Sequence, residues 1–192
     1  MNAPEIRLLL PGDLDPLFEL LRDQREAEAA DPVPHGPYHG DEPFDEDRRR
    51  ASGVEAWARP LSEPEWRRTW GAFDRTLCVG EVSLTGSGLR TGLHRADVGL
   101  GVRRTHRGRG VGRSLMTAAI DWARAQPEID WLDLGVFVGN EPAERLYRAL
   151  GFHDRGVTPD RFRIDGRRID DRSMTLWVGA GDSPLARTKP TS

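Results

Sequence analysis

The chain has 192 residues, a length that suits a single domain with a hydrophobic core. Its 28 basic and 31 acidic residues give a net charge of −3, which argues against a nucleic-acid-binding surface. The single cysteine, Cys78, excludes an internal disulfide and a zinc cluster built from cysteines. No apolar run approaches the roughly 20 residues that span a bilayer, and no secretory signal is visible. We therefore expect a cytoplasmic protein with no membrane and no nucleic-acid partner.

The first third of the chain combines a short strand, a helix and a polar segment. Residues 6–10 are apolar and predict a strand, and Asp13 is typical of the N-cap of the leucine-rich helix that follows. Residues 22–53 are rich in charge, proline and glycine, with an acidic cluster at 41–47. A long loop with one helical piece is the expectation, and it is either a lid or binding element or a passive solvated loop.

The next segment predicts a helix and then strands. Ser62 and Glu65 form a capping box, so we expect a helix from there to about Phe73. Its aromatic residues, interpreted as core packing rather than a cofactor platform, are Trp66, Trp70 and Phe73. Two strands, 76–79 and 81–85, are expected to meet at Gly80.

A strand at 94–102 leads into a glycine-rich turn. Gly99 and Gly101 inside that strand indicate a bulge or a close backbone approach. The turn from Arg107 to Gly112 has glycine at alternate positions, and a helix over 110–126 follows it. Such a helix directs its free N–H groups at the turn, which suits an anion such as a pyrophosphate.

The last third alternates strand and helix and ends in strands. A strand at 131–138 precedes a helix that Asn140 caps and Gly151 ends. A hairpin over 161–169 is expected around Asp165-Gly166, followed by a last strand at 173–178 and a disordered tail at 179–192. The order of elements predicts an α/β (α+β) fold around one mostly antiparallel sheet.

Two common phosphate-binding patterns do not fit the glycine-rich turn. Counted from Gly108, the NTPase phosphate loop and the dinucleotide fingerprint each require glycine where Arg113 stands. What matches is Arg107-x-x-Gly110-x-Gly112 between a strand and a helix, joined further on by Asn140-x-x-Ala143-x-x-Leu146-Tyr147-x-x-Leu150-Gly151-Phe152. The two motifs, in this order, resemble the GCN5-related N-acetyltransferase (GNAT) family.

The resemblance implies a fold and a reaction. The fold would be a single domain over 1–178 with about seven strands, splayed between the fourth and fifth, and with 22–61 as an insertion on the acceptor side. The reaction would move the acetyl group of acetyl-CoA directly to a primary amine of a small molecule or peptide, with no metal. The alternative is a non-catalytic acetyl-CoA-binding regulatory module, and a homodimer is an open option for either.

The resemblance also implies a set of site residues. The stretch around Gly99–Val102 would offer backbone N–H groups to the thioester carbonyl, the turn would hold the pyrophosphate, and Asn140 would contact the pantetheine as well as cap its helix. The residues expected at the cofactor are Leu100, Gly101, Val102, Arg107, Gly108, Arg109, Gly110, Val111, Gly112, Asn140 and Tyr147.

Two residues are candidates for proton transfer. Tyr147 could protonate the departing thiolate, since a phenol has a pKa of about 10; outside the motif it would be interpreted as packing. Asp97 stands where many relatives carry a glutamate base, and it is either the base, acting through water, or a structural residue. The glutamate that some relatives use five residues before the asparagine is replaced here by Gly135, and His94 is the weaker alternative.

Overall fold

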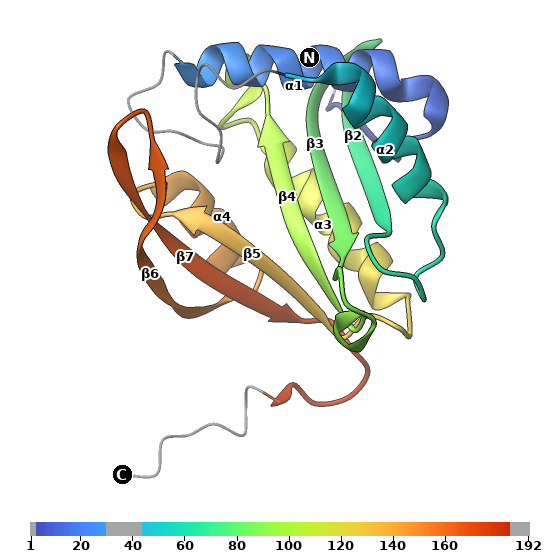
Figure 1. Ribbon diagram of the computed structural model, residues 1–192, viewed down its shortest axis with the longest axis vertical. Coiled ribbons are helices and arrows are strands. Elements are labelled where there is room, and N and C mark those ends of the chain that lie inside the picture. The colour runs from blue at the N-terminus through green and yellow to red at the C-terminus, as the bar shows by residue number, and fades with distance from the viewer. Residues whose placement is uncertain (1–2, 30–43, 185–192) are drawn as a thin grey trace.

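The computed structural model of the protein describes residues 3–29 and 44–184 (Figure 1). Within them lie seven strands, four helices and three short 3₁₀ turns. The strands are β1 (Glu5–Leu8), β2 (Arg67–Asp74), β3 (Leu77–Gly86), β4 (Arg95–Val102), β5 (Trp131–Phe137), β6 (His153–Ile164) and β7 (Arg167–Trp177). The helices are α1 (Leu14–Ala29), α2 (Glu46–Ala58), α3 (Val111–Arg124) and α4 (Glu141–Ala149). None of the helices in these ranges is long and apolar enough to cross a membrane.

All seven strands form one sheet, in the order β1-β2-β3-β4-β5-β7-β6. Every neighbouring pair is antiparallel except β4 and β5, which run parallel and pair only from Arg95–Trp131 to Asp97–Asp133. Beyond Asp97 the two strands diverge, and Figure 1 shows them meeting at the lower end of the sheet and separating upward. The predicted fold class is confirmed, including the splay between the fourth and fifth strands.

Helices cover both faces of the sheet. A Cβ built on Gly80 of β3 would lie 3.0 Å from Leu115 of α3, so this face packs on α3. A Cβ built on Gly101 of β4 would lie 2.5 Å from Gln24 of α1, so the other face is covered by α1. The main core lies on the α3 side of the sheet, where Leu115, Met116 and Ala123 are fully buried.

The helix predicted from Ser62 to Phe73 is wrong, because this segment contains β2. Glu65 has a φ of +60°, which a helix does not accommodate, and the backbone N–H of Gly86 donates to the carbonyl of Trp66 at 2.9 Å. Pairing with β3 therefore overrides the local capping signal. The aromatic residues of the segment are nevertheless core residues, since Trp66 and Trp70 are 0% and 6% exposed.

The segment predicted as a loop with a helical piece holds the end of α1 and most of α2. Asp45 caps α2 by accepting from the backbone N–H of Arg48 at 3.0 Å. Glu46 forms ion pairs with Arg22 of α1 and Arg50 of α2, and so ties the two helices together. The acidic residues at 41 and 42 lie outside the described residues, as does 185–192 of the predicted tail.

In two places the strands are longer than the sequence predicted. The strands expected on either side of Gly80 are one continuous strand, β3, because Gly80 gives α3 room to approach. The hairpin turn at Asp165-Gly166 is confirmed, with φ of +47° and +78°. Its strands β6 and β7 run far beyond the predicted 161–169, because the two pair along most of their length.

Candidate active site

The opening between β4 and β5 is the centre of the candidate site. Beyond Asp97, β4 keeps its antiparallel partner β3 as far as Val102 but has no ladder with β5. Backbone groups on that edge are therefore available to a ligand, since an unpaired strand edge presents free N–H and C=O groups. The predicted thioester-binding stretch, Leu100 to Val102, lies on this edge.

The glycine-rich turn follows directly at the end of β4. Gly108 and Gly110 have φ of +72° and +83°, a conformation that favours glycine, and a Cβ on either would meet no atom within 4 Å. Gly110 is the N-cap of α3, and no side chain caps the helix there. The first N–H groups of α3 thus point into open space, with the positive end of the helix dipole behind them.

Positive charge surrounds this turn. Arg107, Arg109 and Arg113 are exposed, and the Arg107 Nε donates to the carbonyl oxygen of Val102 at 3.1 Å. That bond links the turn to the end of β4. The combination of free N–H groups, glycine and arginine suits a pyrophosphate.

Helix α4 brings a tyrosine to the opening. Asn140 caps the helix by accepting from the backbone N–H of Ala143 at 3.3 Å. The helix is anchored to β7 by the buried Glu144, which pairs with Arg172 at 3.3 Å. A Cβ on Gly112 would lie 3.4 Å from Leu146, so α4 packs closely on the start of α3.

Tyr147 is buried, with 7% of its surface exposed, and its ring packs on Phe152 at 5.9 Å between centroids. Burial raises the pKa of its phenol to about 12, and the nearby Glu81 carboxylate adds to this rise. The phenol is therefore protonated at neutral pH and can act as a proton donor.

Asp97 lies at the closed end of the opening, in register with Thr85 of β3 and Asp133 of β5. Partial desolvation raises the pKa of its carboxyl, the neighbouring Asp133 raises it further, and Arg95 lowers it. Asp133 itself is held by Arg95 through two contacts of 2.6 Å. Asp97 thus lies beside a structural ion pair.

Glu81 is a second carboxylate, which the sequence analysis did not single out. It lies on β3 in register with Gly101, level with the open part of the splay. Burial raises its pKa to about 7, and Arg67 opposes this rise. Its sequence position, between apolar residues of a strand, is typical of a solvent-facing residue and carried no signal. The strand register places it opposite Gly101, and its charge acts on Tyr147.

Comparison with known proteins decides the family. The model of the Acetyltransferase (GNAT) family matches residues 16–152. The chain belongs to this family. The predicted enzyme class, an acetyltransferase, is thereby confirmed.

Individual relatives of this GNAT chain are distant. YdaF of Bacillus subtilis (strain 168) is 23% identical over 165 residues, 86% of each chain. The L-amino acid N-acetyltransferase AaaT of Escherichia coli (strain K12) is 32% identical over 77 residues, 40% of this chain and 48% of AaaT. The structure of the phosphinothricin acetyltransferase (Pat) of Sinorhizobium meliloti in complex with AcCoA superposes with a TM-score of 0.75 at 19% identity, covering 100% of this chain and 94% of Pat.

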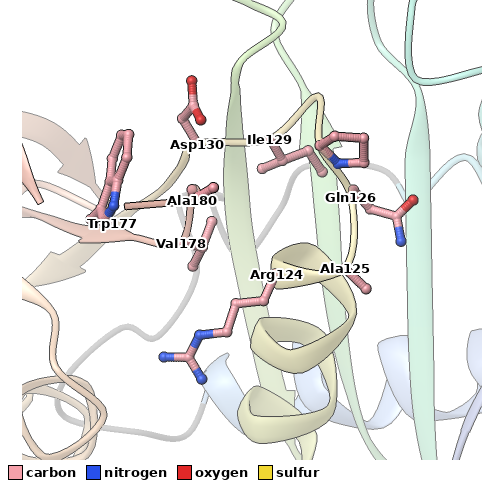
Figure 2. Close-up of a pocket in the computed structure, with 10 residues that line it drawn as sticks. Arg124, Ala125, Gln126, Ile129, Asp130, Trp177, Val178 and Ala180 are labelled. Carbon is pink, nitrogen blue, oxygen red and sulfur yellow. The ribbon is translucent and has the colours of Figure 1, made fainter. Parts of the chain in front are cut away.

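A separate cavity of about 560 Å³ lies away from this GNAT site. Figure 2 shows it between the C-terminal end of α3, marked by Arg124, and two further residues: Asp130, in the loop before β5, and Trp177, at the end of β7. The glycine turn is at the other end of α3, roughly 20 Å along the helix. None of the predicted site residues lines this cavity, so it takes no part in the candidate site.

Proposed function

We propose that this GNAT protein transfers the acetyl group of acetyl-CoA directly to a primary amine of a small molecule or a peptide. The observation that carries the proposal is the opening between β4 and β5, with an anion-binding turn at its end and a protonated Tyr147 beside it. The AcCoA complex of Pat and the amino-acid acceptor in the name of AaaT support the choice of co-substrate and acceptor class.

The residues fit acetyl-CoA in three places. The turn from Arg107 to Gly112 would hold the pyrophosphate on the α3 N–H groups. Backbone N–H groups between Leu100 and Val102 would bind the thioester carbonyl and stabilise the negative charge that develops on its oxygen. Asn140 would contact the pantetheine as well as cap α4.

Acyl transfer to an amine needs a proton acceptor and a proton donor. Tyr147 would donate its phenolic proton to the sulfur as the carbon–sulfur bond breaks. The proton of the acceptor ammonium goes to a carboxylate or to water, and the carboxylates near the opening are Asp97 and Glu81. The sequence pattern names Asp97 either as this base or as a structural residue.

The experiment that tests this function is a screen of amine acceptors. Acetyl-CoA is supplied to the purified protein together with L-amino acids, short peptides, polyamines or aminoglycosides, and release of the free thiol of coenzyme A is followed. We expect release that depends on one class of amine and an acetylated product. Tight binding of acetyl-CoA without turnover on any amine would support the alternative, a regulatory module. The cytoplasmic location and the homodimer stay predictions.

A further inference from the structure

Glu81 occupies a particular place in the central sheet. It pairs with Gly71 of β2 on one side and Gly101 of β4 on the other, so no side chain of a paired residue flanks its carboxylate. Among the described residues no hydrogen bond or ion pair to Glu81 is found, and the opposing charge is that of Arg67. The residue is partly exposed, so a ligand can reach it.

The walls around Glu81 come from three elements. A Cβ on Gly71 would lie 2.7 Å from Leu9 and from Phe73, so one wall is apolar. A Cβ on Gly101 would lie 2.5 Å from the Gln24 Nε2 of α1, so the amide of Gln24 forms the opposite wall. An apolar wall strips water from a carboxylate, which makes it a stronger base.

The side-chain amide of Gln24 is a second feature that indicates a ligand. Its Nε2 is buried and finds no hydrogen-bond partner among the described residues. A buried N–H donor without a partner costs free energy, and such a donor is satisfied when a ligand oxygen binds next to it. The orphan donor and the Glu81 carboxylate both lie at Gly101, on the face that α1 covers.

The position of Tyr147 relates Glu81 to the reaction. The proton donor to the sulfur and the proton acceptor from the amine act on the same carbonyl carbon, so they must border the same point. The Glu81 carboxylate is close enough to Tyr147 for its charge to raise the pKa of the phenol. Asp97 is four residues from Gly101 along β4, a distance of roughly 13 Å. At Asp97 the two strands β4 and β5 are still paired.

We propose that Glu81, rather than Asp97, receives the proton of the acceptor ammonium, next to Gly101 and beneath the amide of Gln24. The inference rests on the proposed function and names its base. Asp97 then has a structural role at the closed end of the splay, next to the Arg95–Asp133 ion pair.

The proton balance is complete. The ammonium gives one proton to the Glu81 carboxylate, and the free amine forms a carbon–nitrogen bond with the thioester carbonyl. As the carbon–sulfur bond breaks, the sulfur takes the Tyr147 proton, and the phenolate is reprotonated by the second proton that the attacking nitrogen loses. Glu81 releases its proton to solvent, so the products are an amide, coenzyme A and one proton.

The pH dependence follows from the groups that face Glu81. These are Arg67 from β2, Cys78 on β3 and Tyr147 from α4, and the charge of Arg103, which follows β4, acts on Cys78. Arg103 is paired with Glu19 and Asp23 of α1, at 3.5 Å and 3.0 Å, so its charge is largely compensated. The carboxyl of Glu81 must be ionised to act as base, and its pKa is about 7.

The test compares the pH profiles of kcat/KM for two matched variants, Glu81→Gln and Asp97→Asn. The acceptor is a primary alkylamine from the screen, whose ammonium has a pKa of about 10. We expect wild-type kcat/KM to rise with pH and to level off above about 7. In Glu81→Gln, kcat at neutral pH should fall about 10²-fold, and the profile should keep rising toward about pH 10 as free amine forms. Asp97→Asn should keep the wild-type plateau.

Two further measurements exclude a merely structural effect. Glu81→Gln should bind acetyl-CoA with wild-type affinity in calorimetry, and Glu81→Asp should restore part of the rate and the plateau. The proposal is overturned if Glu81→Gln keeps the wild-type kcat and plateau, or if Asp97→Asn loses the plateau instead. Failure of the proposed function looks different, because wild-type protein would then turn over no amine at all.

Discussion

A buried phenol and a partly buried carboxylate have widely separated pKa values in this site. Burial raises the pKa of Tyr147 to about 12 and that of Glu81 to about 7. The phenol therefore keeps its proton, whereas the carboxylate exchanges its proton readily near neutrality. Pairs of titratable groups whose environments separate their pKa values are typical of acid and base roles in one active site.

Replacement of Tyr147 by phenylalanine tests the acid. The variant Tyr147→Phe removes the hydroxyl and keeps the ring that packs on Phe152 at 5.9 Å, so the melting temperature should change little. We expect kcat to fall on the order of 10²-fold, the range for loss of a general acid, with near-normal affinity for acetyl-CoA. The measurement is steady-state kinetics under conditions in which chemistry limits turnover. A variant with full kcat there would mean that the thiolate departs unassisted.

Among the elements, the start of α3 binds the anion in our proposal, and its geometry allows a controlled test. Gly110 has a φ of +83°, so both Gly110→Ala and Gly110→Asp must adopt a left-handed conformation. Each should lose about 1–2 kcal/mol of stability for that reason. Only Gly110→Asp adds a negative charge where the pyrophosphate would lie.

We expect wild-type protein and Gly110→Ala to show a rise in melting temperature with acetyl-CoA, because a ligand that binds only the folded state stabilises it. Gly110→Asp should show none. Thermal unfolding of the three proteins with and without acetyl-CoA gives the answer. If acetyl-CoA raised the melting temperature of the two variants equally, the turn would not be part of the cofactor site.

The insertion before β2 calls for a similar separation of folding from binding. Asp45 and Glu46 hold α2 in place, so Asp45→Ala should cost about 1 kcal/mol of stability through the lost cap. The acidic cluster at 41–47 could also attract a cationic amine, and neutralising Asp41, Glu42 and Asp47 together tests this hypothesis. We expect a raised KM for a cationic acceptor and unchanged affinity for acetyl-CoA. An unchanged KM would make the stretch a passive loop.

For the molecule as a whole, sequence reasoning reached the fold through local signals that the tertiary structure reinforces. The glycine turn and the capped helix at Asn140 are determined by residues adjacent in the chain, and both have the predicted form. The segment around Glu65 was mispredicted because a capping box competes with strand pairing, and only the partner strand decides between them. Glu81 was missed for the same reason, since its neighbours Gly71 and Gly101 are distant in sequence.

Because Glu81 is desolvated in the folded protein, the free energy of unfolding of the whole molecule should depend on pH. Its pKa is about 7 in the folded protein against an ordinary value of 4.5, so the folded state binds more protons between those values. Stability from this group is therefore fully present below about pH 4.5 and is lost as the pH rises through about 7. Glu81→Gln stays neutral at every pH and avoids that loss.

We expect Glu81→Gln to unfold in urea with a free energy on the order of 2–3 kcal/mol above wild type at about pH 8, and close to wild type at about pH 4.5. Asp97 and Asp171 also have raised pKa values, but they are present in both proteins and cancel in the difference. The exposed Asp121, changed to asparagine, is the control for loss of a carboxylate from the surface. A difference between Glu81→Gln and wild type that is the same at both pH values would contradict the desolvated environment assigned to Glu81. A substitution that stabilises the fold at pH 8 while lowering kcat marks a residue retained for chemistry, since active-site groups are commonly kept at a cost in stability.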